Sequence, residues 1–493
     1  MNRIKEVLER KGIKQVWLAE KLGKSYNMVN SYVQNRQQPR LEILNQIANL
    51  LDVDIKDLIQ SSKNMNAKVK EIFVGNSSQI NTSTKELTEK YSIKNKQIIR
   101  TVFTRHGEEI ESKMRLIDRK GNEEIADMFD RSWLLSKKQP ERLFERGVVK
   151  VVDLFAGCGG LSVGAEEACR ALGLVHQTVL ANDIDDKILQ IYKINFPKAE
   201  TLAVPIEDLF DGACGMPLSN NEEKIKKKLG KIDLLIGGPP CQGNSDLNNH
   251  TRREDPKNEL YLKMARFCEV IRPKNVIIEN VPGVLHDKGQ VAQRTWQILK
   301  NLGYKISTGV VNCLDIGVPQ NRKRSITLGS LEIEPNVHQC VEDFRVNPRN
   351  LFWSISDLEN INTEDIVFDT SPKYSEENIK RIGYLFDNQI YDLPNSERPD
   401  CHRLKKHSYN SVYGRLRMDK YAPTITTGFG TPGRGRFIHP TKRRTITPHE
   451  AARIQFFPDF YNFNSNNRVL IQTVIGNAVP PKLGYILTMH LLK

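Results

Sequence analysis

Over the first 60 residues, apolar side chains recur every three or four positions, which is the spacing of short amphipathic helices. The segments with this pattern are 4–8, 15–22, 26–34, 41–51 and 55–59. A tight Gly-Lys-Ser link joins the second and third of them, and Ser25 of that link is a natural N-cap for the helix that follows. The pattern therefore predicts a small helical domain over residues 1–62, with a helix-turn-helix inside it.

The next part of the chain, residues 63–146, has a weaker pattern. Its first half is rich in Ser, Asn, Lys and Thr, a composition that is typical of linkers. Further on, the pattern favours a hairpin within 96–126 and a helix over 127–146 that Pro140 breaks. We therefore treat residues 63–146 as a linker and connecting region.

From Val148 onward, short apolar runs that suit strands alternate with segments of helical periodicity. The predicted strands cover 148–154, 178–183, 232–236, 275–280, 308–312 and 325–329, and the predicted helices cover 161–172 and 258–271. Strands that alternate with helices usually form a parallel sheet covered on both faces. The pattern therefore predicts an α/β fold, a Rossmann-like doubly wound parallel sheet, over residues 147–330.

The alternation is lost after residue 330 and returns toward the end of the chain. Residues 331–440 have no internal repeat, and we expect them to form an inserted domain. A helix over 447–456 and a closing helix from about residue 480 indicate that residues 441–493 return to the α/β domain. A chain of 493 residues is long enough for several domains of this kind.

Positive charge is concentrated in one stretch of the inserted domain and the segment after it. The chain has a net charge of +14, and residues 401–445 hold eleven Lys and Arg against one acid, Asp419. A short basic run is usually a solvated surface, but Tyr and Phe side chains are interleaved with this one. Aromatic and basic side chains together are typical of nucleic-acid binding, so we expect a nucleic acid as partner.

Two features of the composition narrow the choice of protein class. The chain has no apolar stretch of about 18 residues and no apolar signal core at its start, so we expect a cytoplasmic protein. Its eight cysteines include no Cys-x-x-Cys pair, which argues against a zinc site and against a disulfide framework. We expect no metal.

One cysteine stands in an unusual setting. Residues 237–243 read Gly-Gly-Pro-Pro-Cys-Gln-Gly and follow the apolar run 232–236, so Cys241 comes directly after a buried strand. The prolines fix the backbone, and the glycines let it approach a flat ligand closely. Amide groups and the start of a helix lower the pKa of a thiol in such a place. Most unpaired cysteines are small buried hydrophobes, but this pattern predicts that Cys241 is a nucleophile.

A glycine-rich turn, Phe-Ala-Gly-Cys-Gly-Gly over residues 155–160, follows the first predicted strand. Such turns occur in sites for NAD, FAD and adenosylmethionine, so the turn alone does not choose among them. Asp183 at the end of the second strand suits ribose hydroxyls, and Asp208 lies where an adenine amino group would be held. Together they favour a ligand that contains adenosine.

Further candidate residues follow the later strands. Glu279 ends the strand 275–280, where parallel-sheet enzymes place their chemistry, and Arg322 and Arg324 are two positions apart on an extended segment. The segments 447–453 and 476–481 read Thr-Pro-His-Glu-Ala-Ala-Arg and Gly-Asn-Ala-Val-Pro-Pro. In this order, the motifs from the first strand to residue 481 resemble those of bacterial DNA (cytosine-5)-methyltransferases of restriction-modification type.

This resemblance implies a covalent mechanism. The Cys241 thiolate would attack carbon 6 of a cytosine while Glu279 binds and protonates ring nitrogen 3, and carbon 5 would then take the methyl group of S-adenosylmethionine. Arg324 would hold cytosine oxygen 2, with Arg322 and Ser245 near the backbone phosphates. The target base would have to leave the stacked duplex to be reached.

The same resemblance implies the remaining binding residues. The cofactor residues would be Phe155, Gly157, Gly159, Gly160, Asp183, Asp208, Pro240, Leu260 and Asn477. Two positions depart from the usual pattern: Asn244 stands where Phe is common in the catalytic loop, and Asp183 stands where Glu is more usual. Residues 331–440 would be the target-recognition domain, in which Arg415, Arg417 and Arg434 suit guanine edges or phosphates.

The front domain resembles the helix-turn-helix of lambda-repressor and Cro type regulators. By that resemblance, Tyr26, Asn27, Asn30 and Ser31 would face bases, while Asn35 and Arg36 would lie near phosphates. By the same resemblance, the front domain would bind the promoter of the enzyme's own gene, and a cognate restriction endonuclease would recognise the same DNA site as the methyltransferase. Three alternatives stay open: a regulator with a vestigial methyltransferase half, an RNA cytosine methyltransferase and, least favoured, an NAD-dependent oxidoreductase.

Overall fold

The computed structural model describes most of the chain. The described residues are 2, 4–11, 13, 15–35, 37–51, 53, 58, 89–117, 123–240, 259–361, 366–404 and 411–493. They divide into two compact units, Met1–Glu86 and Leu87–Lys493, which are treated separately below. Within the described residues, no helix has the length and apolar character needed to cross a membrane.

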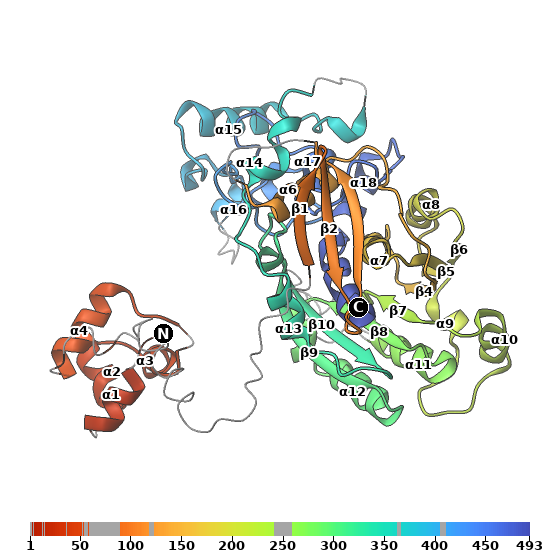
Figure 1. The fold of residues 1–493 in the computed structure, drawn as a ribbon. Coiled ribbons are helices and arrows are strands. Elements are labelled where there is room, and N and C mark those ends of the chain that lie inside the picture. The colour runs from red at the N-terminus through yellow and green to blue at the C-terminus, as the bar shows by residue number, and fades with distance from the viewer. Residues whose placement is uncertain are drawn as a thin grey trace. The chain divides into compact units, whose positions relative to one another are not determined.

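The first unit is the predicted bundle of short helices (Figure 1). Its described helices are α1 (Ile4–Lys11), α2 (Gln15–Leu22), α3 (Tyr26–Val33) and α4 (Leu41–Leu51). The predicted helix over 55–59 lies, apart from Leu58, outside the described residues. Ser25 caps α3 as the sequence predicts, because its Oγ accepts a hydrogen bond from the Met28 amide at 3.4 Å. Leu18 of α2, Val29 of α3 and Ile47 of α4 are fully buried together, so one small core orients the helix-turn-helix.

The second unit is built on a seven-stranded sheet with the strand order β6-β5-β4-β7-β8-β10-β9. The strands are β4 (Val148–Leu154), β5 (Val175–Asp183), β6 (Glu200–Ala203), β7 (Leu234–Gly237), β8 (Asn275–Asn280), β9 (Lys305–Asn312) and β10 (Lys323–Ser330). The predicted sheet is thus confirmed, with one correction. It is mixed rather than parallel, because β10 pairs antiparallel with both β8 and β9.

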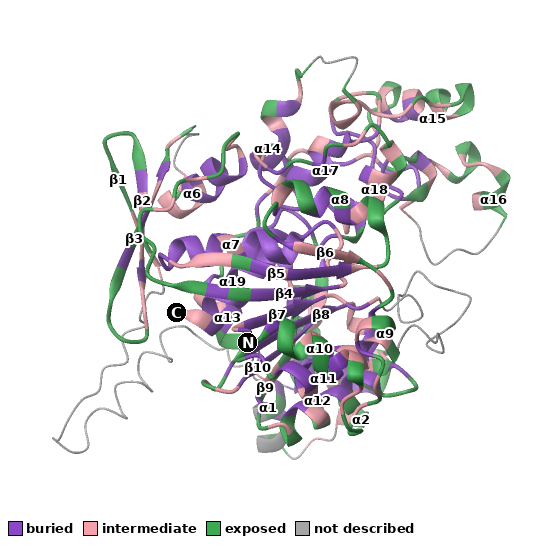
Figure 2. Cartoon of the chain, turned by 90° about the vertical axis from the view of Figure 1, so that its right-hand side faces the viewer, coloured by how far each residue is buried: buried purple, intermediate pink, exposed green. Residues whose placement is uncertain are grey.

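Helices cover both faces of this sheet (Figure 2). They are α7 (Gly160–Ala171), α8 (Asp186–Asn195), α9 (Ile206–Leu209), α10 (Asn220–Leu229), α11 (Tyr261–Ile271), α12 (Val291–Asn301), α13 (Val337–Asp343) and α19 (Pro481–Leu492). Successive residues of β4 enter different cores: Val151 packs in the cluster that includes α7 and α19, and Val152 packs in the cluster that includes α11 and α12. Two-sided burial explains why these strands are apolar runs.

Part of the predicted connecting region is folded. A three-stranded antiparallel sheet of β1 (Glu89–Lys94), β2 (Gln97–Phe103) and β3 (Glu109–Arg115) precedes α6 (Ile125–Leu134). The predicted hairpin is the β2–β3 pair. The predicted helix over 127–146 is wrong in length, because the chain leaves the helix at Leu135, before Pro140 is reached.

Buried ion pairs fix this small sheet and α6 to the rest of the unit. Arg100 of β2 donates from Nη2 to Glu167 of α7 at 2.8 Å. Asp130 of α6 accepts hydrogen bonds from Lys482 of α19 and from Arg349, both at 2.8 Å. These charged groups are at most 8% exposed. Residues 89–134 are therefore an integral part of the second unit.

The region between β10 and the closing helices has little regular structure, as the sequence predicts. It contains α14 (Leu351–Ile355), α15 (Glu376–Asp387) and α16 (Asp400–Arg403), and is followed by α17 (Pro448–Ile454) and α18 (Arg468–Asn477). Short 3-10 helices lie at Pro282–His286, Cys313–Ile316, Ser356–Leu358, Val367–Asp369, Asn395–Glu397 and Pro432–Arg434.

Close contact between α7 and α19 depends on Gly164, where a Cβ would collide with the Pro481 carbonyl.

Candidate active site at the carboxyl edge of the sheet

The glycine-rich turn after β4 is held against the end of β5. The Gly157 amide donates to Asp183 Oδ2 at 2.9 Å, and the Asp185 amide donates to Asp183 Oδ1 at 3.1 Å. Phe155 and Gly157 have φ angles of 55° and 54°, so the chain passes through left-handed conformations as it leaves the strand. Burial raises the pKa of the Asp183 carboxyl. The predicted turn and the predicted acid thus form one structure.

The three predicted glycines have different surroundings. A Cβ on Gly157 would meet no atom within 4 Å, so this residue borders open space. A Cβ on Gly159 would lie 2.9 Å from the Tyr192 ring, and one on Gly160 would overlap the Val479 carbonyl oxygen. Gly159 and Gly160 therefore have a packing reason to be glycine.

A buried polar network below the turn is absent from the sequence prediction. Ser162 Oγ donates to Asp153 Oδ2 at 2.6 Å and lies 2.7 Å from the Tyr192 hydroxyl. Burial raises the pKa of Asp153 to about 7. An acid inside the apolar run of β4 is the sequence signal that could have indicated this network. Asp153 joins β4, α7 and α8 beneath the turn.

Other predicted cofactor residues lie along the same edge of the sheet. Asp208 is exposed on α9, whose backbone carbonyls at Asp208 and Leu209 accept hydrogen bonds from Asn221. Phe155 and Leu260 are half-buried and pack against the same apolar cluster. Ile184, which the sequence reasoning missed, is 72% exposed directly after Asp183. Single exposed apolar side chains are common on this chain, so Ile184 gains interest only from its position next to Asp183.

The Cys241 loop starts beside Glu279. A Cβ on Gly238 would lie 3.3 Å from Glu279 Oε2, and Asn280 donates from Nδ2 to the Pro239 carbonyl at 3.0 Å. Pro240 is half-buried at the end of the described segment. Cys241 and Ser245 themselves lie outside the described residues. The start of their loop is thus attached to the end of β8.

Glu279 and Arg324 form a pair across neighbouring strands. Glu279 of β8 faces Ile326 of β10 in the strand register, and Arg324 is two residues earlier on the same face. Arg324 Nε lies 2.6 Å from Glu279 Oε1, and both side chains are largely buried, with 12% and 9% exposure. A carboxylate and a guanidinium therefore stand side by side where the Cys241 loop begins.

Five of the described cysteines are buried and therefore poor nucleophiles. Cys158, Cys169, Cys268, Cys313 and Cys340 are buried, and none of the described cysteines forms a disulfide. Burial raises the pKa of the Cys158 thiol to about 12. Among the described residues, no cluster of His, Cys, Asp and Glu has the makings of a metal site.

Arg322 requires a correction. The sequence places it near DNA phosphates, but it is 2% exposed, and its guanidinium donates to the carbonyls of Ile425 at 3.1 Å and Ala478 at 2.8 Å. Burial lowers the pKa of Arg322 to about 9. Side chains alternate along this extended segment, and since Lys323 points to solvent, Arg322 points inward. There it donates hydrogen bonds to carbonyls of two backbone segments. Arg322 is a structural link between the recognition region and α18.

Asn477, a predicted cofactor residue, ends α18 and is exposed. The residue before it, Gly476, packs against the backbone of Thr426 and Thr427 so closely that a Cβ would overlap it. Backbone hydrogen bonds join Asn321 and Pro319 to Ala422 at 2.8 and 2.9 Å. The segment that carries the recognition arginines is therefore fixed to the strand that carries Arg324.

The three predicted recognition arginines differ in their surroundings. Arg415 requires a correction, because its Nε and Nη2 donate to the Pro440 carbonyl at 2.8 and 2.6 Å and its guanidinium lies 3.9 Å from the Phe386 ring centre. It is half-buried, and these contacts stabilise the fold of the region. Arg417 and Arg434 are exposed. Arg417 is 3.3 Å from Asp419 and lies over the Tyr391 ring.

The predicted DNA-facing side of α3 is accessible in part. Tyr26 and Asn27 are exposed, while Asn30 and Ser31 are half-buried. Arg36 lies outside the described residues. The expectation that Asn35 lies near phosphates needs correction: its side chain donates to the Asn2 carbonyl at 2.9 Å and accepts from the Asn2 amide at 2.8 Å, which ties the chain start to the end of α3.

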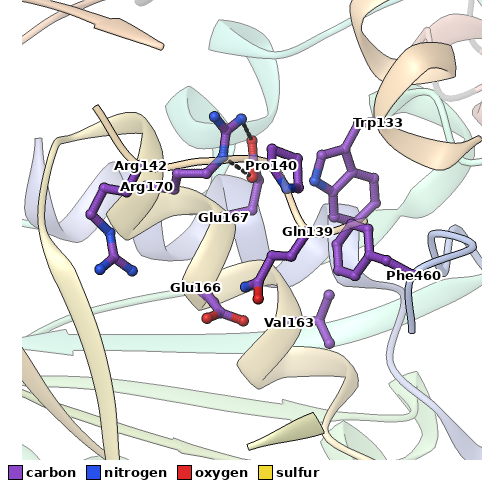
Figure 3. A pocket seen from close by; sticks show the side chains of 9 residues that line it. All are labelled: Trp133, Gln139, Pro140, Arg142, Val163, Glu166, Glu167, Arg170 and Phe460. Atoms are coloured by element: carbon purple, nitrogen blue, oxygen red, sulfur yellow. Dashed lines mark hydrogen bonds and ion pairs between the residues drawn. The ribbon is translucent and has the colours of Figure 1, made fainter. Parts of the chain in front are cut away.

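A cavity of about 240 Å³ lies apart from these residues (Figure 3). Its wall consists of Trp133, Gln139, Pro140, Arg142, Val163, Glu166, Glu167, Arg170 and Phe460. Arg170 is engaged with Glu167 there at 2.7 Å. The cavity contains none of the predicted site residues, so the candidate active site is the open edge of the sheet and not this closed-in space.

Comparisons with known proteins agree with the motifs. Residues 149–493 match the model of C-5 cytosine-specific DNA methylases, and residues 4–58 match a helix-turn-helix model. The chain is 45% identical to the type II methyltransferase M1.BsuMI of Bacillus subtilis (strain 168) over 83% of this chain and 96% of that protein. It is 33% identical to the type II methylase M.HgiDII of Herpetosiphon aurantiacus over 68% and 93% of the two chains.

A solved structure shows the same fold. The S. pombe Dnmt2 methyltransferase matches 70% of this chain and 98% of its own, with a TM-score of 0.50 and 18% identity. The ordered motifs, the sheet that positions them and the two matching families lead to one conclusion. The chain belongs to the C-5 cytosine-specific DNA methylases and is a DNA (cytosine-5)-methyltransferase with a helix-turn-helix domain in front of the enzyme.

Proposed function

We propose that the enzyme methylates a cytosine that has left the DNA duplex, with Cys241 as nucleophile and S-adenosylmethionine as methyl donor. The observation that carries the proposal is the 2.6 Å contact between Glu279 and Arg324 beside Gly238, where the Cys241 loop starts. A carboxyl group and a guanidinium at adjacent positions match ring nitrogen 3 and oxygen 2 of one cytosine. Cys241, Glu279 and Arg324 would thus contact carbon 6, nitrogen 3 and oxygen 2 of the same cytosine.

Each residue has a separate task in this mechanism. The Cys241 thiolate forms a bond to carbon 6, and Glu279 donates a proton to ring nitrogen 3, so that the electron pair moves to carbon 5. Arg324 holds oxygen 2 and keeps the ring in place. After methyl transfer, carbon 5 loses its proton, the thiolate leaves carbon 6, and ring nitrogen 3 returns its proton to Glu279, which restores the aromatic ring and the enzyme. Because carbon 6 is hidden in a stacked pair, the base must flip out first, at a cost of a few kcal/mol.

The predicted cofactor residues fit S-adenosylmethionine, which supplies an electrophilic methyl group when bound. Gly157 borders open space at the turn, and the Asp183 carboxyl, which accepts from the Gly157 amide, would also accept hydrogen bonds from ribose hydroxyls. Asp208 would accept a hydrogen bond from the adenine amino group, and Phe155 would stack on the ring. Pro240, Leu260 and Asn477 would complete the pocket, while Gly159 and Gly160 act through packing.

The proposal also covers the partners. Arg417 and Arg434 remain as exposed recognition arginines that would contact a specific duplex site. The type II names of the relatives support a role in restriction and modification, in which an endonuclease cleaves the same site when it is unmethylated. The helix-turn-helix would bind the promoter of the enzyme's own gene and limit its synthesis. The proposal places the enzyme in the cytoplasm, with its DNA.

The test is transfer of a tritiated methyl group from S-adenosylmethionine to unmethylated DNA. We expect label on carbon 5 of one cytosine in a fixed sequence, no label with Cys241→Ser, and full label with Cys401→Ser, a matched control at an exposed position. Glu279→Gln should lower kcat by about 10²–10⁴-fold. Label from Cys241→Ser at the rate of the intact enzyme would refute the assigned nucleophile, and label in RNA alone would refute the substrate.

The promoter role has its own test. DNA from upstream of the gene should be bound by the full chain and released by the double variant Asn27→Ala/Asn30→Ala, with methyl transfer unchanged. Binding that survives this variant would contradict the assigned face of α3.

A further inference from the structure

The outward face of α3 has no charged side chain. The helix reads Tyr-Asn-Met-Val-Asn-Ser-Tyr-Val, and its buried side consists of Val29, Tyr32 and Val33. The accessible residues are Tyr26, Asn27, Met28, Asn30, Ser31 and, at the C-cap, Gln34. This face therefore offers amide groups, the hydroxyls of Tyr26 and Ser31, and apolar surface to a DNA groove.

The chemistry of the face selects among base pairs. In the major groove, a bidentate contact to guanine needs Arg or Lys, whereas Asn and Gln form a bidentate contact with adenine N6 and N7. Apolar side chains contact the thymine methyl group. Tyr26 and Met28 are 49% and 41% exposed on α3 and can supply that contact. Apart from the hydroxyls of Tyr26 and Ser31, which suit either pair, the accessible groups on α3 thus favour A·T over G·C.

The amides of Asn27 and Asn30 are available for such contacts. Within the described residues, neither side chain is engaged with another group of the protein, in contrast to Asn35, whose amide is occupied by Asn2. Ser31 Oγ donates to the Met28 carbonyl at 2.7 Å, so it faces the groove mainly as an acceptor. Base contacts would therefore not have to compete with internal ones at Asn27 and Asn30.

The spacing of the two amides fits neighbouring base pairs. Asn27 and Asn30 are three residues apart, which is about 4.5 Å along a helix axis and similar to the rise of about 3.4 Å between base pairs. Ser25 fixes where α3 begins, so both residues fall in its first two turns, the part of a recognition helix that enters the groove.

From these observations we infer that the helix-turn-helix reads a half-site with adjacent A·T pairs under Asn27 and Asn30, a sequence separate from the methylation site. This inference rests on the proposed DNA binding of the front domain and adds which bases it selects. It predicts that the DNA sequence bound by the helix-turn-helix differs from the sequence that the enzyme methylates.

The experiment is selection of duplexes with a randomised centre by the full chain without S-adenosylmethionine. The parent chain should enrich the methylation site and a second site with an A·T core. Asn27→Arg should replace one A·T pair of the second site by G·C, with a change in preference of roughly 5- to 150-fold. Asn45→Arg, at an exposed position of α4, is the matched control and should leave both sites unchanged.

Three outcomes would overturn the inference. A second site with a G·C core in the parent chain would refute the base preference, and so would a second site that Asn27→Arg leaves unaltered. Enrichment of the methylation site alone would show that the front domain does not select DNA, which would also refute its proposed promoter role. The last result differs from the first two because no second site would appear.

Discussion

Replacement of Arg322 separates a structural role from a DNA-binding role. In Arg322→Met the carbonyls of Ile425, Gly476 and Ala478 lose the guanidinium that now lies 3.1, 3.3 and 2.8 Å from them. A buried polar group without its partner costs about 1–3 kcal/mol, so the gross loss is roughly 3–9 kcal/mol. Removal of a buried charge, whose cost is visible in the lowered pKa of Arg322, offsets part of this loss. We expect a net destabilisation of about 2–4 kcal/mol.

The assay is urea unfolding of the full chain, together with DNA affinity as a function of salt. Arg322→Met should lower the unfolding midpoint and leave the salt dependence of binding unchanged. Arg434→Met, an exposed matched variant, should leave the midpoint unchanged, and if Arg434 contacts a phosphate the slope of log K against log [salt] falls by about 0.9. An unchanged midpoint together with a reduced slope for Arg322→Met would refute the structural role.

Three further predictions concern the turn, the buried acid and the small sheet. Gly160→Ala should destabilise the enzyme by about 3 kcal/mol, because the new Cβ overlaps the Val479 carbonyl oxygen. Gly157→Ala should cost only about 1 kcal/mol, because its Cβ enters open space and only the positive φ is unfavourable. Equal shifts of the melting temperature in the two variants would contradict this packing difference. The pKa of Asp153 is raised from 3.8 to about 7 in the folded enzyme, so the unfolded chain holds fewer protons between these values and stability should fall as pH rises through them. Asp153→Asn should remove that slope in unfolding experiments from pH 4 to 8, and a slope that persists would assign the effect to another group. A chain that starts at Leu87 should keep methyl transfer, whereas one that starts at Gly147 should be inactive or insoluble. The shorter chain lacks Asp130 and Asp127, so the buried Lys482 and Arg349 lose these carboxylate partners, at about 3–5 kcal/mol for a broken buried pair. An active product from Gly147 would refute this.

Local signals predicted much of the fold. The limits of β4 and β8 are those predicted, because the buried apolar positions 151–152 and 276–278 mark both segments as strands in the sequence. The direction of β10 could not be predicted in this way, because a buried strand has the same pattern in either direction. The start of α3 was predictable because a cap such as Ser25 is a contact between neighbours in the chain.

The same distinction between local sequence signals and tertiary contacts applies to the candidate site. The order of the motifs that contain Cys241, Glu279 and Arg324 indicated the chemistry through its resemblance to a known family, and a motif keeps its residue types whatever surrounds it in the fold. The sequence alone, however, assigned Arg322, Arg415 and Asn35 to DNA. An arginine or asparagine has the same donors whether it binds a phosphate or a carbonyl, so only its surroundings distinguish the two.

The sequence alone determined the class of reaction, the presence of a helix-turn-helix, and which motif follows which strand. These features depend on residue identity and on spacing between neighbours in the chain. Tertiary structure decided which charges are exposed, which glycines are needed for packing, and that residues 89–134 belong to the enzyme unit. Those properties depend on partners far away in the chain, such as Tyr485 for Arg100 at 3.1 Å, and burial by a distant segment leaves no mark on the local pattern.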